Sequence, residues 1–387
     1  MKRTFMISAM AIAACTLATA QVKEDFKPAS TNQSGKQYPM VNSERVVRAQ
    51  VTAPDAKYVQ FDIGGVKYDL TKDENGVWTG DTAPQDEGFH YYQIWVDGAA
   101  TPDPNSLYYY GASRWGSGID IPAHDEDFYA VKNVPHGDVR EVYYYSKTND
   151  AMRHCYIYTP ASYDTDLEKR YPVLYLQHGG GESEHGWPQQ GKTGLIMDNL
   201  IAAGLAEEFI IVMDNGSWAR PRPAAGEQPQ ARPQGQGGRP GMPANWADGF
   251  KNTLINDIIP MVDARYRTIA DKEHRAMAGL SMGAMQTKAI TMACPDVFSK
   301  LGLFSGGTIS VEEAANAPGF RDAYDLVFVS FGSREVERPR GGVDPGKITA
   351  DLKASGMNAH YYVSPETAHE WQTWRRSLYQ FAQLLFK

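Results

Sequence analysis

The chain has 387 residues, 42% of them hydrophobic, and a formal net charge of −8. This length leaves room for more than one domain, and we expect two. The acidic balance argues against nucleic acid as a partner and against a basic membrane-binding surface.

Residues 1–20 have the pattern of an export signal. Lys2 and Arg3 precede an apolar run at residues 5–17, and Ala-Thr-Ala at 18–20 is a small-residue cleavage site. The run is too short to cross a membrane as a stable helix. An alternative is a bacterial lipobox at 12–15, which would leave a lipidated Cys15. Either interpretation predicts an exported protein, periplasmic or extracellular, without an integral membrane span.

Residues 21–40 are polar and rich in turn residues, and we expect a flexible lead-in there. From 41 to 122 the chain alternates short strand patterns, such as Val59, Phe61 and Ile63, with Gly, Asp and Asn turns. Short strands at close spacing predict a small β-sandwich.

An aromatic segment at residues 103–121 ends this region. It holds three adjacent tyrosines, Tyr108 to Tyr110, and Trp115. These rings could stack on a sugar or a phenolic ring, or pack at a domain interface, which we favour. Residues 123–138 are expected to be the linker.

From residue 139 to 387 the pattern changes, and predicted strands alternate with predicted helices. This alternation predicts a mostly parallel sheet with helices on both faces, an α/β fold. We expect strands at 142–145, 155–158, 173–176, 209–213, 275–278, 301–304, 326–331 and 360–363, and helices at 249–264 and 371–386.

A low-complexity stretch, residues 219–243, interrupts this pattern. It is rich in Pro, Gln, Gly and Arg and cannot form a packed core. It is either a lid beside the active site or a floppy insertion. Its arginines, Arg220, Arg222, Arg232 and Arg239, are either an attractor for an anionic substrate or simply solvated.

Outside the export signal the cysteines are Cys155 and Cys294. Two cysteines make no disulfide framework, and no metal-ligand spacing is present. We therefore expect two buried free thiols, with a bridge as the alternative in an oxidising compartment. No cofactor and no metal are implied.

Residues 279–283, Gly-Leu-Ser-Met-Gly, form a G-x-S-x-G motif. Such a motif places its serine on a sharp turn between a buried strand and a helix, with the hydroxyl clear of the sheet. The strand pattern before Ser281 and the helix pattern after it supply that context. The competing interpretation is an ordinary turn serine at a tight strand–helix joint.

The catalytic base and acid should follow Ser281 in the order acid, then histidine. Of the two later histidines, His360 lies inside a predicted strand, whereas His369 lies in the loop after it and is the predicted base. The acid should follow the strand at 326–331. We favour Glu335, which is closest to the strand end, over Glu337 and Asp344.

The oxyanion hole requires two N–H donors. One should be the amide of Met282, directly after the nucleophile. The other should come from the glycine loop His178-Gly179-Gly180-Gly181, and Gly180 is the predicted donor. A phosphate-binding role for this loop is disfavoured because no Lys-Ser or Lys-Thr follows it.

With these residues identified, residues 140–387 resemble carbohydrate esterase family 1, the group of feruloyl esterases and acetyl xylan esterases. The matching segments are the HGGG loop with Trp187, residues 259–268, the Ser281 motif, and His369-Glu370-Trp371. The resemblance implies an α/β-hydrolase fold with Ser281, His369 and Glu335 as the triad, although many members have Asp as the acid. The N-terminal region resembles the Ig-like, carbohydrate-binding-module-like domain found ahead of such esterases in gut Bacteroidetes.

The expected function is therefore a secreted serine esterase that removes feruloyl groups from plant cell-wall xylan, through an acyl-enzyme. Its partner would be an acylated polysaccharide or oligosaccharide. Alternatives are an acetyl xylan esterase, a siderophore esterase of the enterobactin type, and a catalytically inactive carbohydrate-binding protein.

Overall fold

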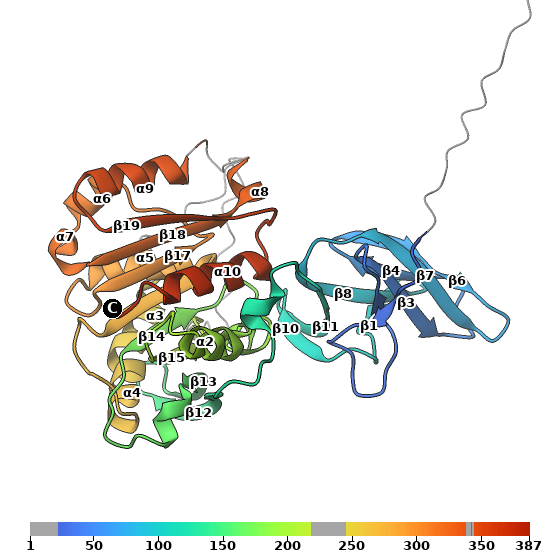
Figure 1. The fold of residues 1–387 in the computed structure, drawn as a ribbon, viewed down its shortest axis with the longest axis horizontal. Coiled ribbons are helices and arrows are strands. Elements are labelled where there is room, and N and C mark those ends of the chain that lie inside the picture. The colour runs from blue at the N-terminus through green and yellow to red at the C-terminus, as the bar shows by residue number, and fades with distance from the viewer. Residues whose placement is uncertain (1–21, 218–244, 338–341, 343) are drawn as a thin grey trace, which may run out of the picture.

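The computed structural model describes residues 22–217, 245–337, 342 and 344–387. An all-β part and an α/β part lie side by side, the former in blue to teal and the latter in green to red (Figure 1). We call them the sandwich and the hydrolase part. In the described ranges, no helix has the length and apolar character needed to cross a membrane.

The sandwich consists of two antiparallel sheets that share one core. The core includes Val47 and Trp78 from one sheet, and Phe61, Ile94 and Ile119 from the other. The five-stranded sheet has the order β1 (Lys27–Pro28), β2 (Met40–Val41), β3 (Val46–Thr52), β7 (Val77–Pro84), β6 (Thr71–Lys72). The other has the order β10 (Tyr108–Gly111), β11 (Arg114–Ile121), β8 (Gly88–Val96), β4 (Val59–Ile63), β5 (Val66–Asp69), with β9 (Ala99–Thr101) also paired to β8.

The flexible lead-in expected at residues 21–40 is wrong for its described part. Lys27 pairs with Val41 and Pro28 with Met40, so this segment forms the edge of the five-stranded sheet. The Gln33 amide also donates to the Asn105 carbonyl at 2.7 Å. Because these strands are only two residues long, they carry no alternating apolar pattern.

The hydrolase part is built on an eight-stranded sheet. Its order is β12 (Asp138–Ser146), β13 (Ala151–Thr159), β15 (Ile210–Asp214), β14 (Val173–Gln177), β16 (Arg275–Leu280), β17 (Lys300–Phe304), β18 (Leu326–Gly332), β19 (Ala359–Ser364). The strands from β15 to β19 are parallel, and β12 and β13 pair antiparallel at one edge. The predicted α/β architecture is confirmed.

Helices cover both faces of this sheet, so alternate residues of its strands enter two cores. Val173 and Tyr175 face one core, while Leu174 and Leu176 face the other. The helices with buried residues in the first core are α3 (Asp248–Thr253), η3 (Leu254–Ile258), α4 (Ile259–Arg265), α5 (Met282–Ala293), α6 (Val311–Asn316), α7 (Phe320–Ala323) and α9 (Pro345–Ala354). Those in the second are η1 (Glu126–Tyr129), α1 (Gly186–Gln189), α2 (Thr193–Ala202) and α10 (Trp371–Ala382). The short helix η2 (Ala161–Asp164) adds Tyr163 to the first core, and α8 (Ser333–Val336) is a further short helix.

The helix expected at 249–264 is divided. A π-helical segment, η3, separates α3 from α4, and Pro260 lies in the first turn of α4. Proline has no N–H to donate to the preceding turn, so the regular α-helical ladder cannot run through it. The division was not visible in the apolar periodicity, which continues across both helices.

The sandwich joins the hydrolase part through a buried apolar contact. Phe89 of β8 and Tyr109 of β10 belong to the same core cluster as Trp371 and Trp374 of α10. Trp115 lies edge-on to His185 of the hydrolase part, with ring centroids 5.0 Å apart. Tyr109 and Trp115 of the aromatic segment at 103–121 therefore contact the hydrolase part, the favoured of the two expected roles, while Tyr108 and much of Trp115 stay exposed.

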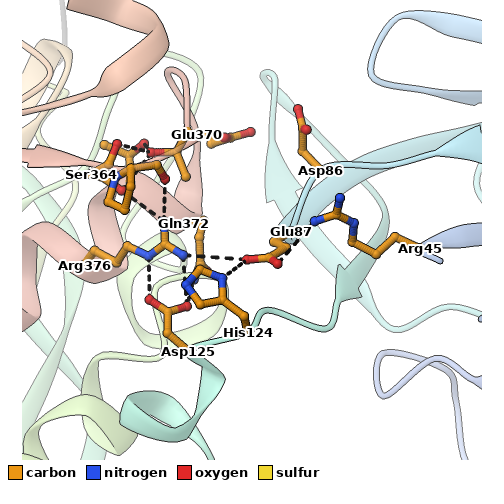
Figure 2. Close-up of polar contacts among 12 residues, drawn as sticks. Arg45, Asp86, Glu87, His124, Asp125, Ser364, Glu370, Gln372 and Arg376 are labelled. Atoms are coloured by element: carbon orange, nitrogen blue, oxygen red, sulfur yellow. Dashed lines mark hydrogen bonds and ion pairs between the residues drawn. The ribbon is translucent and has the colours of Figure 1, made fainter. Parts of the chain in front are cut away.

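Two arginines of α10 add ion pairs to this contact. Arg375 is fully buried and donates from both terminal nitrogens to Asp120 at 2.9 Å. Arg376 pairs with Asp125 at 2.7 Å and lies 3.7 Å from Glu87, which also pairs with Arg45 of the sandwich (Figure 2). The two parts are thus held together by α10, the helix that follows His369.

Candidate active site

Ser281 occupies the sharp turn between β16 and α5. Its backbone has φ 51° and ψ −111°, outside the regions that L-residues usually adopt. The structure accommodates this turn because glycines let the backbone pack closely around it. A Cβ on Gly283 would lie 2.6 Å from the His178 carbonyl oxygen, and one on Gly306 would lie 2.3 Å from that of Ser281. The motif therefore has the strand–turn–helix context that the sequence predicts.

Ser281, His369 and Glu335 form a continuous chain of hydrogen bonds. His369 Nε2 lies 2.9 Å from Ser281 Oγ, and His369 Nδ1 lies 2.8 Å from Glu335 Oε1. Each residue follows the carboxyl end of a parallel strand: β16, β18 and β19. Because those ends meet at one edge of the sheet, side chains far apart in the sequence converge there.

The Glu335 carboxylate is held by three further groups. Its Oε2 accepts from the Gly332 amide at 2.8 Å and from the Ser305 hydroxyl at 2.7 Å. Ser305 in turn accepts from the indole of Trp374 at 3.1 Å. Burial opposes ionisation, but the hydrogen bonds from His369, Gly332 and Ser305 outweigh it and hold the pKa of Glu335 below its usual value. The group is therefore an anion suited to orient an imidazole.

The other candidates for acid and base lie elsewhere. Asp344 accepts from the amides of Gly346 and Lys347, and so caps the N-terminus of α9. Glu337 is exposed at the end of α8. His360 lies in β19, where its Nε2 contacts Asn358 at 2.9 Å. Of the predicted alternatives, only Glu335 contacts His369 among the described residues.

The glycine loop after β14 lies against the Ser281 turn. A Cβ on Gly179 would be 3.4 Å from Ser281 Cβ, and one on Gly180 would be 3.9 Å from Met282 Cβ. Gly180 thus lies next to Met282. The assignment of these two amides as oxyanion donors stays a prediction.

An apolar cavity of about 640 Å³ opens on one side of Ser281 and His369. Its walls include Met285 and Met292 of α5, Phe331 and Trp246. Lys288 also lines it, and its ammonium is bonded to Glu313 and to the Thr308 carbonyl. We call this space the α5 cavity.

A second cavity, of about 410 Å³, opens on the other side of the same two residues. One wall comes from the sandwich, through Gly64, Gly65, Tyr91 and Ala112. The opposite wall comes from the hydrolase part and is formed by Gly179, Gly180, Glu182, Leu280, Glu370, Trp371 and Trp374. We call it the interface cleft.

Sequence analysis did not identify the sandwich residues of this cleft. They come from strands and turns whose local patterns indicate only a sandwich, and nothing local signals that they approach residues 179–182. Glu182 was also missed, although it directly follows the glycine loop. Burial raises the pKa of its carboxyl group to about 7.

The cysteines outside the predicted export signal lie at two elements of the hydrolase part. Cys155 in β13 is a buried free thiol, as predicted, whereas Cys294, which follows α5, is a free thiol that is only partly buried; burial raises the pKa of each. Cys15 and the cleavage site at 18–20 lie outside the described residues, as does the segment 219–243 with its arginines.

Comparison with known proteins places this geometry in context. Residues 146–318 match the family described as Putative esterase. The chain is 45% identical over 375 residues to an endo-1,4-beta-xylanase/feruloyl esterase of Xylanibacter ruminicola, covering 94% of this chain and 48% of that protein. It is 25% identical over 259 residues to endo-1,4-beta-xylanase Y of Acetivibrio thermocellus, covering 59% of this chain and 21% of that protein. The chain therefore spans half or less of the length of these relatives.

Solved structures match the fold. The CE1 ferulic acid esterase of Anaeromyces mucronatus superposes with a TM-score of 0.53 at 23% identity, covering 68% of this chain and 96% of that one. The enterobactin esterase of Shigella flexneri gives a TM-score of 0.61 at 16% identity, covering 88% of this chain and 92% of that one. At these identities the likeness concerns the fold alone. Residues 146–318 of this chain thus match an esterase family, within an α/β-hydrolase fold that follows an all-β domain.

Proposed function

We propose that the chain is a serine carboxylic-ester hydrolase that removes feruloyl or related hydroxycinnamoyl groups from plant cell-wall xylan. The observation that carries this proposal is the chain Ser281–His369–Glu335, with a cavity on each side of the serine. The relative from Xylanibacter ruminicola, which carries feruloyl esterase in its name, supports the choice of acyl group.

In the proposed mechanism Ser281 Oγ attacks the ester carbonyl carbon while His369 Nε2 takes its proton. The Glu335 carboxylate holds the Nδ1–H and stabilises the imidazolium. The amides of Gly180 and Met282 donate to the oxyanion of the tetrahedral intermediate. The intermediate collapses as the sugar oxygen leaves with the proton from His369. Water, deprotonated by the same histidine, then attacks the acyl-enzyme and releases the acid and Ser281.

The shapes of the two cavities suggest how the substrate divides between them. The α5 cavity is apolar and large enough for a planar aromatic acyl group, whereas an acetyl group would leave most of its 640 Å³ unfilled. We assign the acyl group to the α5 cavity and the sugar to the interface cleft. The cleft lies between the two domains and carries the polar Glu182 and Tyr91.

The α5 cavity also bears on the siderophore alternative. Lys288 is the cation among its described lining residues, and its ammonium is bonded to Glu313. The interface cleft is lined by Glu182 and Glu370 but by no Lys or Arg among the residues the structure describes. These walls favour a neutral ester over a strongly anionic siderophore.

Export, by cleavage after residue 20 or by lipidation of Cys15, is part of the same proposal. A polymeric plant substrate must be met outside the cytoplasm. Mass measurement of the protein from the culture medium and the cell envelope would distinguish a chain cleaved after residue 20 from a lipidated one.

A hydrolysis panel tests the proposed chemistry. The chain lacking residues 1–20 would be given methyl ferulate, acetylated xylan and a short 4-nitrophenyl ester. Ser281→Ala removes the nucleophile, and Ser355→Ala removes a hydroxyl at the end of α9, remote from the serine turn, as the control. We expect ferulate release by the wild type and by Ser355→Ala but not by Ser281→Ala.

Acetate release without ferulate release would move the assignment to an acetyl xylan esterase. Activity that survives Ser281→Ala, or no activity on any substrate, would overturn the mechanism.

A further inference from the structure

The loop that carries Gly180 is anchored at its two ends by the hydrolase part. At its start, the Gly216 amide donates to His178 Nε2 at 3.0 Å. At its end, Glu184 accepts from the Asn215 side chain at 2.7 Å and pairs with His154 at 2.9 Å. Between these anchors lie residues 179–182, which we call the oxyanion loop.

The middle of the oxyanion loop is held by the sandwich through a backbone bond. The Ser113 amide, in the turn between β10 and β11, donates to the Gly181 carbonyl at 2.8 Å. Gly181 has φ 79° within a turn that the Glu182 amide closes onto the Gly179 carbonyl at 3.2 Å. That positive φ suits the third position of a type II turn, which favours glycine. The bond from Ser113 thus holds the Gly181–Glu182 peptide, one residue beyond Gly180.

Tyr91 of β8 makes the second hydrogen bond from the sandwich to the oxyanion loop. Its hydroxyl donates to the Glu182 carboxylate, with the two oxygens at 3.0 and 2.9 Å. The same oxygen accepts from Gln190 Nε2 at 2.7 Å and from the indole of Trp371 at 3.3 Å. Tyr91 therefore connects the oxyanion loop to the helix that follows His369.

Gly111 makes room for this tyrosine. A Cβ at Gly111 would lie 2.0 Å from the Tyr91 hydroxyl oxygen, so a larger residue would push the ring out of place. The sandwich is therefore shaped around Tyr91 at the point where it meets the hydrolase part.

We propose that the sandwich is a working part of the active site, in which Tyr91 and Ser113 are positioning residues for the oxyanion loop. By fixing Gly181 and Glu182 they keep the Gly180 amide beside the Met282 amide. The inference rests on the proposed function and deepens it, since Gly180 is there an oxyanion donor. It differs from a domain that only binds carbohydrate, because its effect extends to esters without a sugar.

That difference defines the experiment. Methyl ferulate has the acyl group but no sugar, so a sandwich that merely held carbohydrate would leave its turnover unchanged. Displacing an oxyanion donor lowers kcat, because the donor acts on charge that develops in the transition state. The kcat and KM for methyl ferulate are therefore the quantities to measure.

Tyr91→Phe removes the hydroxyl, and Tyr92→Phe is its matched control. Tyr92 is the next residue of β8 and donates to Asp103 at 2.8 Å, inside the sandwich and away from the oxyanion loop. Both variants lose one tyrosine–carboxylate hydrogen bond, part-buried for Tyr91 and buried for Tyr92. We expect Tyr91→Phe to lower kcat by roughly 10-fold to 100-fold, within the range for a lost oxyanion donor, with KM changed less than about twofold. Tyr92→Phe should keep the wild-type kcat.

A second pair of variants covers the case in which Tyr91→Phe does not fold. Glu182→Gln keeps an oxygen that can accept from Tyr91, whereas Glu182→Ala does not. We expect Glu182→Gln to retain more of the wild-type kcat than Glu182→Ala. Equal kcat values for Tyr91→Phe and Tyr92→Phe, or for the two Glu182 variants, would overturn the inference.

Failure of the proposed function would look different. If the wild type hydrolysed only acetyl esters, the proposed acyl group would be wrong, and the same kcat comparisons with 4-nitrophenyl acetate would decide the positioning role. If hydrolysis did not depend on Ser281, both proposals would fall.

Discussion

The sandwich and the hydrolase part contribute to the candidate site in different ways. The hydrolase part places Ser281, Glu335 and His369 just beyond the ends of buried parallel strands. The sandwich places Tyr91 and the turn at 112–113 against a loop of its neighbour. The side chains of the candidate triad thus come from the hydrolase part alone. The groups that hold the oxyanion loop and line the interface cleft come from both parts. Changes in the Ser281–His369–Glu335 chain should therefore act on chemistry, whereas changes on either side of the interface should act on geometry and cohesion.

The largest effect is expected within the hydrolase part. Glu335→Gln leaves the site without the anion that orients His369 and stabilises its imidazolium. We expect kcat to fall about 10³-fold to 10⁴-fold, as for the loss of a triad carboxylate elsewhere. Glu337→Gln is the control and should retain activity, because that side chain is exposed. A comparable loss in Glu337→Gln or Asp344→Asn would reassign the acid.

The cohesion of the two parts should depend most on Arg375. Arg375→Met would leave Asp120, in a side chain only 11% exposed, without its partner. Such an orphaned charge costs about 3 to 5 kcal/mol of unfolding free energy. Denaturant unfolding measures this cost, and the double variant Arg375→Met/Asp120→Leu should recover part of it. An unchanged midpoint for Arg375→Met would show that the pair does not hold the interface.

The interface should also respond to pH through Glu182. Its pKa in the folded protein is about 7 because of burial, above the 4.5 of an exposed glutamate. The folded state thus binds this proton more tightly than the unfolded state, so the stability contributed by this group is fully present below pH 4.5 and is lost as pH rises through 7. The shift corresponds to about 3 kcal/mol. We expect the melting temperature of the wild type to fall between pH 4.5 and 8, and Glu182→Gln to reduce this fall. An equal fall in the variant would contradict the raised pKa of Glu182.

The smallest effect is expected at the exposed edge of the same interface. Arg334 pairs with Asp86 of the sandwich, and the two side chains are 43% and 46% exposed. Exposed ion pairs contribute about 0 to 1 kcal/mol and are screened by salt. Arg334→Ala should therefore change the unfolding free energy by less than about 1 kcal/mol and leave kcat unchanged. A loss as large as that of Arg375→Met would mean that this edge carries the contact.

The three side chains of the candidate triad were accessible to sequence analysis because their signals are local. A G-x-S-x-G segment between strand and helix patterns points to Ser281, and elimination among the later histidines leaves His369. Glu335 was favoured over Glu337 and Asp344 because it is closest to the strand end. Each inference needs only the order of the strands and the residue that follows each end. The structure brings these three side chains within hydrogen-bonding distance.

The contacts of the sandwich were not accessible in this way. Tyr91 and Glu182 are separated by 91 positions, and neither residue type marks the pairing. The same limit explains the error at 21–40, where two-residue strands depend on partners rather than on their own pattern. Pro260 was visible in the sequence, but the continuing apolar periodicity masked its effect on the helix.

The bond between Tyr91 and Glu182 has a consequence for how such proteins diversify. A sandwich exchanged by recombination would have to bring a hydroxyl to the same place, and a glycine where position 111 now gives it space. A chimera whose new sandwich lacks this hydroxyl and this glycine would lose the bond that holds the oxyanion loop. The two domains should therefore be exchanged together, and chimeric esterases should be joined at positions outside both domains.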